Sequence, residues 1–131
     1  MTGGSYNLLL GFLDQYKIKG RIADYGGTVK IGGTQVAKAL KDHGIKDYHM
    51  LDYDSGIDLL KPIKGKKFDA GICMHLLEHT SNPFIVCENI QNSLKRGSYL
   101  FVTAPFIWEV HNYPNDYWRF TKFGLQKLFA E

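Results

Sequence analysis

The sequence predicts an α/β fold in which a parallel sheet carries helices on both faces. Short apolar segments alternate along the chain with segments whose apolar residues have helical spacing. Repeats of strand, helix and strand form parallel sheets with right-handed crossovers. Ligands bind such sheets at the carboxyl ends of the strands. The residues expected at those ends are Asp24, Gly26, Asp52, Asp54, Met74, His75 and Pro105.

Length and composition indicate one domain. The 131 residues are 44% hydrophobic, which is enough for a substantial core. The net charge of +3 is modest, so we expect no nucleic-acid partner. No apolar run reaches membrane length and no signal peptide is evident, so we expect a cytoplasmic protein without membrane contact. Cys73 and Cys87 fall within or beside apolar segments and are expected to be buried free thiols.

The first third of the chain predicts two helices around a short strand. Residues 6–16 have apolar side chains at helical spacing. Residues 22–23 form a short buried strand that ends at Asp24, and residues 35–40 form a helix with Thr34 placed to cap its start.

The remainder of the chain continues the alternation of strands and helices. Pro62 limits the length of the predicted strand 57–60, and Pro105 ends the predicted strand 99–104. The predicted strands are 48–52, 57–60, 68–73 and 99–104, and the predicted helices are 84–94 and 123–129.

A glycine-rich loop joins the first strand to the next helix. It contains Gly26, Gly27, Gly32 and Gly33. A strand, a glycine-rich turn and a helix together bring backbone N–H groups close to a ligand. An ordinary glycine-rich connection explains the same pattern. The spacing does not match the dinucleotide fingerprint, and Gly33 stands where a phosphate-binding loop has its lysine, so a nucleoside-triphosphate binder is the weaker alternative.

Two later segments carry a resemblance to a known family. One reads Phe68-Asp-Ala-Gly-Ile-Cys-Met-His-Leu-Leu-Glu-His79, followed by Asn82-Pro83-Phe84. It resembles the fourth-strand motif of class I S-adenosylmethionine-dependent methyltransferases. The other reads His111-x-x-Pro114-x-Asp116-Tyr-Trp-Arg-Phe-Thr121 and is similar to a segment in one subgroup of these enzymes. The resemblance covers residues 21–129.

This resemblance implies a Rossmann-like sheet that binds S-adenosyl-L-methionine. Asp24 and Gly26 would hold the methionine end, Asp52 would accept the ribose hydroxyls, and Tyr53 would pack on the adenine. Met74 and His75 would line the sulfonium and substrate pocket. The full implied set is Asp24, Tyr25, Gly26, Gly27, Asp52, Tyr53, Met74 and His75.

The chain also departs from the family. Thr28 stands where a second glycine is usual, and the acid usually found near the adenine amine is missing. Family sheets have seven strands, whereas this chain stops in the helix after the fifth, so we expect a sheet truncated there. A binding protein that holds the cofactor without turnover is therefore the alternative to a methyltransferase.

Methyl transfer from a sulfonium mainly requires that the two partners be oriented and water excluded. A base is needed only where the acceptor is a protonated hydroxyl or amine. The candidates are His75, His111 and Asp116, while His79 is expected to be structural. The acceptor is expected to be a small molecule or a sugar-containing compound.

The pattern His75-x-x-Glu78-His79 also matches a zinc-peptidase motif. No third ligand follows at a suitable spacing, so the prediction is that the protein has no metal site. A divalent cation at His75, Glu78 and His79 is a weaker alternative, because some methyltransferase relatives carry a metal at this motif.

Residues 111–120 are unusually aromatic. We expect Trp118 and Phe120 to form a small core under the last helix, and Tyr113, Asn115 and Tyr117 to roof the acceptor pocket. Arg119 pairs with Glu109, with Asp116 or with a substrate acid.

The last predicted strand, residues 99–104, is apolar and lacks a protective lysine or bulge. We expect a homodimer through this edge, and the alternatives are that residues 111–120 cover it or that the chain is a fragment.

Overall fold

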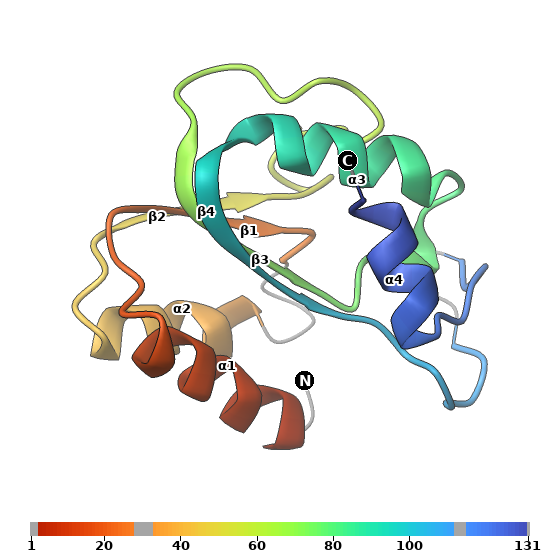
Figure 1. Ribbon diagram of the computed structural model, residues 1–131, viewed down its shortest axis with the longest axis horizontal. Coiled ribbons are helices and arrows are strands. Elements are labelled where there is room, and N and C mark those ends of the chain that lie inside the picture. Colours follow the sequence, from red (N-terminus) through yellow and green to blue (C-terminus); the bar gives the residue numbers. More distant parts are fainter. Residues whose placement is uncertain (1–2, 28–32, 112–114, 131) are drawn as a thin grey trace.

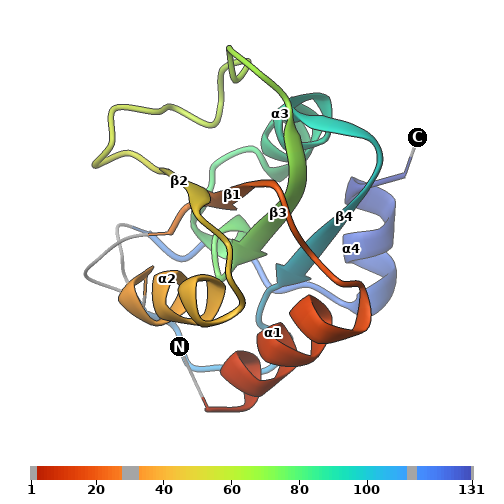
Figure 2. The ribbon, with the colours of Figure 1, turned by 90° about the vertical axis from the view of Figure 1, so that its left-hand side faces the viewer.

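The computed structural model describes residues 3–27, 33–111 and 115–130 of the chain. Within these residues a parallel α/β sheet of four strands forms, in the order β2-β1-β3-β4 (Figures 1 and 2). The strands are β1 (Arg21–Tyr25), β2 (Asp47–Leu51), β3 (Phe68–Met74) and β4 (Leu94–Thr103).

Helices cover both faces of the sheet, as the sequence predicts. Figure 2 shows α1 and α2 on one face, and α3 and α4 on the side of the other. A short 3-10 helix, η2, follows β3. The helices are α1 (Gly3–Gln15), α2 (Gly33–Asp42), η2 (Leu77–His79), α3 (Pro83–Ser93) and α4 (Lys122–Leu128).

Two hydrophobic cores lie on opposite sides of the central strands. Successive side chains of a strand point to opposite faces. Ile22 and Ile72 accordingly pack with α1 and α2, whereas Ala23 and Cys73 pack with α3 and α4. Burial on both faces explains why β1 and β3 read as short continuous apolar runs. Cys73 and Cys87 are both buried and unpaired, which confirms the prediction of free thiols.

The strand order determines where a ligand can approach. From β1 the chain crosses to β2 on one side, and β3 then lies on the other side of β1. The carboxyl end of β1 is therefore the point where the order reverses, which is the usual ligand-binding position in open parallel sheets.

One predicted strand is absent. Residues 57–60 lie in a turn-rich connection, so the sheet has four described strands and not five. Two of the backbone groups that a strand would use have other partners. The Ile57 amide donates to the Asp52 carbonyl at 2.9 Å, and the Asn89 side chain donates to the Leu59 carbonyl at 2.9 Å. Leu59 is buried in the core, which explains its apolar character without a strand.

The start of α2 also differs from the prediction. The helix begins at Gly33 and not after Thr34, and the side chain of Thr34 lies outside what the structure describes. Gly32 and Thr28 lie outside the described residues.

The edge strand β4 is longer and less regular than the sequence predicts. It begins at Leu94, directly after α3, and its register with β3 shifts between Phe68 and Ala70. Lys95 lies in this irregular part and pairs with Asp69 at 2.6 Å. Residues 99–104 themselves contain no lysine or irregularity, as predicted, but the strand also includes residues 94–98, which carry both. Such features discourage pairing between edges.

The described part of the aromatic segment lies beyond the end of β4. The Tyr117 amide donates to the Glu78 carbonyl at 2.7 Å, and the Phe120 amide donates to the Pro105 carbonyl at 3.0 Å. These bonds hold the segment against η2 and the carboxyl end of the sheet. The homodimer through β4 stays a prediction.

In the part of the chain that the structure describes, no helix is both long and apolar enough to cross a membrane.

Candidate functional site

Two buried acids end the neighbouring strands β1 and β2. Asp24 is the fourth residue of β1 and is only 2% exposed, and Asp52 follows β2 and is also buried. Tyr48 lies on the neighbouring strand β2, and its hydroxyl donates a hydrogen bond of 3.0 Å to Asp24 Oδ2. The structure thus brings together the two acids that the resemblance implies.

Burial controls the protonation of Asp24. It raises the pKa of the Asp24 carboxyl from 3.8 to about 7, the Tyr48 hydrogen bond lowers it, and the charge of Asp52 raises it again. The carboxyl can therefore exchange a proton near neutral pH. A cationic ligand group beside it would favour the ionised form.

The two glycines after β1 permit this packing. Gly26 has a φ of +74°, and its amide donates to the Leu51 carbonyl at 2.8 Å. A Cβ on Gly26 would lie 2.6 Å from Leu76 Cδ1, and a Cβ on Gly27 would overlap the Asp24 carboxyl. Both positions therefore require glycine for structural reasons, whatever ligand the loop binds.

Asp52 has a structural task of its own. Its Oδ1 accepts a 2.7 Å bond from the Ser55 amide, and its own amide donates to Ser55 Oγ at 3.0 Å. This reciprocal pair caps the turn after β2 and orients the carboxylate. Tyr53, the next residue, is 87% exposed and is accessible to a ligand.

Tyr25 faces away from this site. Its ring is fully buried in the core beneath α3, and its hydroxyl bonds to Ser93 Oγ at 2.5 Å. A ligand at the carboxyl end of β1 can reach the backbone of Tyr25 but not its side chain.

Met74 and His75 end β3, next to β1. Met74 packs partly against the core on the α1 and α2 face. His75 has a φ of +53°, a conformation that is uncommon outside glycine, and its amide donates to the Thr103 carbonyl at 3.0 Å. Its burial, together with His111 and His79, lowers the pKa of its imidazole.

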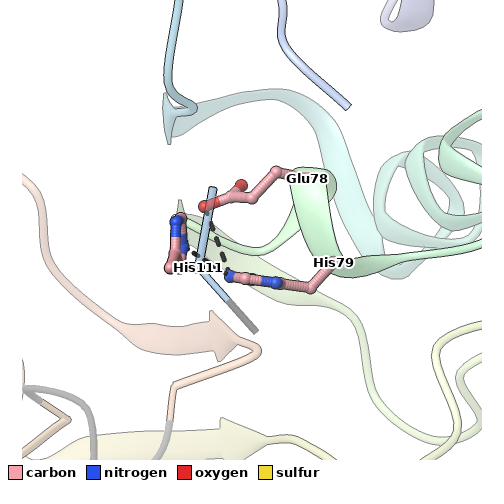
Figure 3. Close-up of side chains that lie close together, drawn as sticks. All are labelled: Glu78, His79 and His111. Atoms are coloured by element: carbon pink, nitrogen blue, oxygen red, sulfur yellow. Dashed lines mark hydrogen bonds and ion pairs between the residues drawn. The ribbon is translucent and has the colours of Figure 1, made fainter. Parts of the chain in front are cut away.

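A second cluster lies on η2 and on the segment after β4. Figure 3 shows the side chains of Glu78, His79 and His111 converging. Nε2 of His79 lies 3.6 Å from Glu78 Oε1 and 3.2 Å from Nε2 of His111. One candidate ligand atom from each of the three residues lies within 4.8 Å of the others.

Glu78 is the unusual member of this cluster. Its side chain is 0% exposed, and neither carboxylate oxygen has a hydrogen-bond partner among the described residues. Burial raises the pKa of the Glu78 carboxyl, while His79 and His111 oppose this shift. A buried carboxyl without a donor is costly and requires a proton or a cation.

Asp116 contacts His111 from outside the cluster. Arg119 holds its two oxygens at 2.5 and 2.8 Å, and the His111 amide donates to it at 2.9 Å. The hydrogen bonds from Arg119 lower the pKa of Asp116 far below its usual range. A carboxylate so stabilised is a poor proton acceptor, so Asp116 has a positioning role in this geometry.

The other predictions for the aromatic segment have mixed outcomes. Phe120 is buried in the core with Leu128 of α4, as predicted. Trp118 is 42% exposed and donates its indole N–H to the Thr80 carbonyl at 2.8 Å, so its predicted burial is wrong. Arg119 pairs with Asp116, one of its predicted partners. Tyr113 lies outside the described residues.

The sequence did not predict the combination of Glu78, His79 and His111. The predicted role of His111 was that of a base, that of His79 was structural, and no third ligand follows the His75-x-x-Glu78-His79 pattern closely. The ligand-type residue that the fold supplies is 32 residues further on. The dense polar and aromatic pattern of residues 111–120 was the available signal.

A groove of about 880 Å³ lies elsewhere, between β4, α3 and α4. Leu100, Val102, Leu125 and Phe129 contribute its apolar lining. Neither Asp24 nor Glu78 lines this groove, and it contains no convergent set of acids and histidines. The chemistry-bearing residues at the carboxyl ends of the strands are therefore the stronger candidate site.

A scan of the chain against protein-family models finds no match, and a search of curated proteins finds none either.

Proposed function

We propose that the protein binds S-adenosyl-L-methionine at the carboxyl ends of β1 and β2, and that it is a methyltransferase for a small-molecule or sugar-containing acceptor. The observation that supports this proposal is the pair of buried acids, Asp24 and Asp52, on either side of the positive-φ Gly26. Asp24 lies at the carboxyl end of β1, where the strand order reverses, and Asp52 follows the neighbouring strand β2.

The chemistry of each acid fits one end of the cofactor. Asp24, whose pKa is raised by burial, would bind the ammonium group of the methionine end, because a cation restores the stability of a buried carboxylate. Asp52 would accept ribose hydroxyls through the oxygen that the Ser55 amide does not use. Tyr53 would provide an exposed ring for the adenine.

In this proposal His75 would act on the acceptor. It directly follows Met74 at the end of β3, and its positive φ turns the chain there. Because its pKa is lowered, its imidazole is neutral at pH 7 and can accept a proton from an acceptor hydroxyl. The cofactor supplies an activated methyl group when bound, and His75 would orient and deprotonate the partner.

Calorimetry with S-adenosylhomocysteine tests the binding part of this proposal. Asp52→Asn keeps an oxygen for the Ser55 amide but removes the charge, and it is expected to weaken binding about 10- to 100-fold. Ser55→Ala is the matched control, because it removes the bond from the Asp52 amide and leaves the carboxylate. Equal affinity of Asp52→Asn and the parent, or tighter binding of ATP than of S-adenosylhomocysteine, would contradict the assignment.

A cofactor-binding protein without turnover is the second candidate. It is favoured by Asp116, which Arg119 and His111 hold in a structural role, so one of the three expected bases is occupied. A labelled-methyl assay over small-molecule and sugar acceptors separates the two candidates. Methyl transfer that is reduced in His75→Gln with unchanged S-adenosylhomocysteine affinity supports the enzyme.

A further inference from the structure

We propose that Glu78, His79 and His111 form a binding site for one divalent transition-metal ion of the zinc type. This site is separate from the acids that end β1 and β2, and the inference does not depend on the proposed cofactor. It rests on the protonation pattern of the two imidazoles, on the unpartnered carboxylate and on the spacing of the ligand atoms.

The contacts of His79 determine which of its ring nitrogens carries the proton. Its Nδ1 lies 2.5 Å from the carbonyl oxygen of Asn115. A carbonyl can only accept a hydrogen bond, so Nδ1 is the donor. In the neutral ring, Nε2 then has a lone pair, and that atom points into the cluster toward Glu78 and His111.

The same argument applies to His111. Its Nδ1 lies 3.3 Å from Asp116 Oδ2 and 3.3 Å from the Glu109 carbonyl oxygen, and both of these groups are acceptors. The proton is therefore on Nδ1, and Nε2 has the lone pair. The two Nε2 atoms are 3.2 Å apart, so two lone pairs face each other with a carboxylate beside them. Such an arrangement requires positive charge at its centre.

Glu78 adds the negative charge that favours a metal ion at this position. Both of its oxygens are buried without a hydrogen-bond partner in the described parts of the chain. A single shared proton would satisfy the two imidazoles but would leave the carboxylate without a direct bond. A divalent cation contacts all three ligands at once, which is the arrangement in which buried carboxylates are stable.

Two of the three separations between the ligand atoms are close to those of a tetrahedral ion, and the third is at most 4.8 Å. Two nitrogen ligands, each about 2.0–2.1 Å from zinc, are about 3.3 Å apart in tetrahedral geometry. The observed separations are 3.2 Å between the two nitrogens and 3.6 Å from His79 Nε2 to Glu78 Oε1. Two imidazoles and one carboxylate suit zinc and similar metals better than magnesium or calcium, and three protein ligands leave one position open.

The surrounding residues complete the pattern of a metal site. Metal-binding histidines usually donate their second ring N–H to a carbonyl or a carboxylate. His79 donates to the Asn115 carbonyl, and His111 donates to Asp116, which Arg119 stabilises. His75, the third member of the motif recognised in the sequence, lies further out, with Nδ1 3.9 Å from Glu78 Oε1. The fold therefore supplies His111 in its place.

The test is a calorimetric titration of the chelator-treated full chain with Zn²⁺ and with Mg²⁺. The expected result is one Zn²⁺ per chain and much weaker binding of Mg²⁺. Titration with Co²⁺ provides a spectroscopic readout, because a tetrahedral site gives intense visible absorption. Failure of the wild-type chain to bind Zn²⁺ at micromolar concentration would overturn the proposal without reference to any variant.

Two variants and a control assign the ligands. Glu78→Gln and His111→Gln are each expected to weaken Zn²⁺ binding about 100-fold or more, which exceeds the loss typical of an outer residue. His49→Gln is the matched control, because His49 pairs with Asp47 on β2 away from the cluster, and it should bind Zn²⁺ like the parent. Circular dichroism checks that each variant is folded. Loss of binding in the control with retention in the cluster variants contradicts the assignment.

Asp116→Asn separates a positioning residue from a ligand. It keeps an acceptor for His111 Nδ1–H but removes the charge, so Zn²⁺ affinity should fall about 10- to 100-fold while the stoichiometry stays at one ion per chain. None of these variants should change the affinity for S-adenosylhomocysteine. Failure of the metal site and failure of the proposed cofactor site are therefore distinguishable.

Discussion

Asp24 and Glu78 are both buried carboxyls near the carboxyl edge of the sheet, yet their surroundings differ. Asp24 accepts a hydrogen bond from Tyr48, whereas Glu78 has no described donor and faces the ring nitrogens of His79 and His111. Burial raises the pKa of both carboxyls. The difference shows that neighbouring atoms, and not burial alone, decide how a buried acid is neutralised.

This comparison assigns the two acids to different ligands. A buried carboxyl with one hydrogen-bond donor, such as Asp24, can be neutralised either by a proton or by a cationic ligand group. A carboxylate beside two imidazole lone pairs has the donor set of a transition-metal site. Substitutions that remove charge but keep shape should therefore have different consequences at the two positions.

The largest expected effect is the pH dependence of stability at Asp24. Its pKa is 3.8 when unperturbed and about 7 in the folded protein. Between these values the folded state keeps a proton that the unfolded state releases, so the stabilisation present below pH 4 is lost as the pH rises through 7. The loss reaches up to about 4 kcal/mol.

Asp24→Asn isolates this effect. The stability of the variant relative to the parent should rise by up to about 4 kcal/mol between pH 4 and pH 8, because asparagine does not titrate. Urea unfolding at several pH values measures the difference, and groups common to both proteins cancel. A difference that does not vary with pH would show that Asp24 titrates normally.

The second effect is that Glu78→Gln should be more stable than the parent without Zn²⁺ but should lose this advantage when Zn²⁺ is present. With chelator present, Glu78→Gln should be about 1–3 kcal/mol more stable than the parent, because an amide replaces a buried carboxylate without donors. With Zn²⁺ at 100 times its dissociation constant, the parent gains about 2.7 kcal/mol and the variant gains little. Thermal unfolding with and without Zn²⁺ measures both. Asp24→Asn is the control, and its response to Zn²⁺ should equal that of the parent.

The third effect concerns the contact between Gly26, which follows β1, and Leu76, which precedes η2. Gly26 and Gly44 have nearly equal positive φ values, +74° and +77°, but only Gly26 packs closely, with a built Cβ 2.6 Å from Leu76 Cδ1. Alanine at either position costs about 1–2 kcal/mol from the backbone. Gly26→Ala should cost about 2 kcal/mol more than Gly44→Ala because it overpacks against Leu76. Equal losses in urea unfolding would show that Leu76 moves aside.

The smallest effect is at Tyr48. Tyr48→Phe removes the donor to Asp24 and should cost about 1 kcal/mol at pH 8. The cost should be smaller at pH 5, because the hydrogen bond lowers the pKa of Asp24 and thus favours its ionised form. Urea unfolding at the two pH values provides the comparison. A cost that is larger at pH 5 would indicate that Tyr48 stabilises the protonated carboxyl instead.

Local patterns in the sequence determined most of the fold. The apolar runs at β1 and β3 have an acid or a histidine directly beyond them, and helical spacing identifies α1 and α3. These features depend on interactions between near neighbours, so one sequence suffices to find them. Residues 57–60 are predicted to form a strand but do not, and Leu59 is buried in the core without one.

Tertiary structure decided what the polar residues contact. The sequence by itself placed Asp24, Asp52 and His75 at strand ends, and it identified Glu78-His79 and residues 111–120 as unusual. Only the fold brings His111 to 3.2 Å from His79, and only the fold turns Tyr25 away from the site. Contacts between residues that are far apart in the sequence depend on how the strands and loops pack. The spacing of two residues along the chain does not determine how close they lie in space.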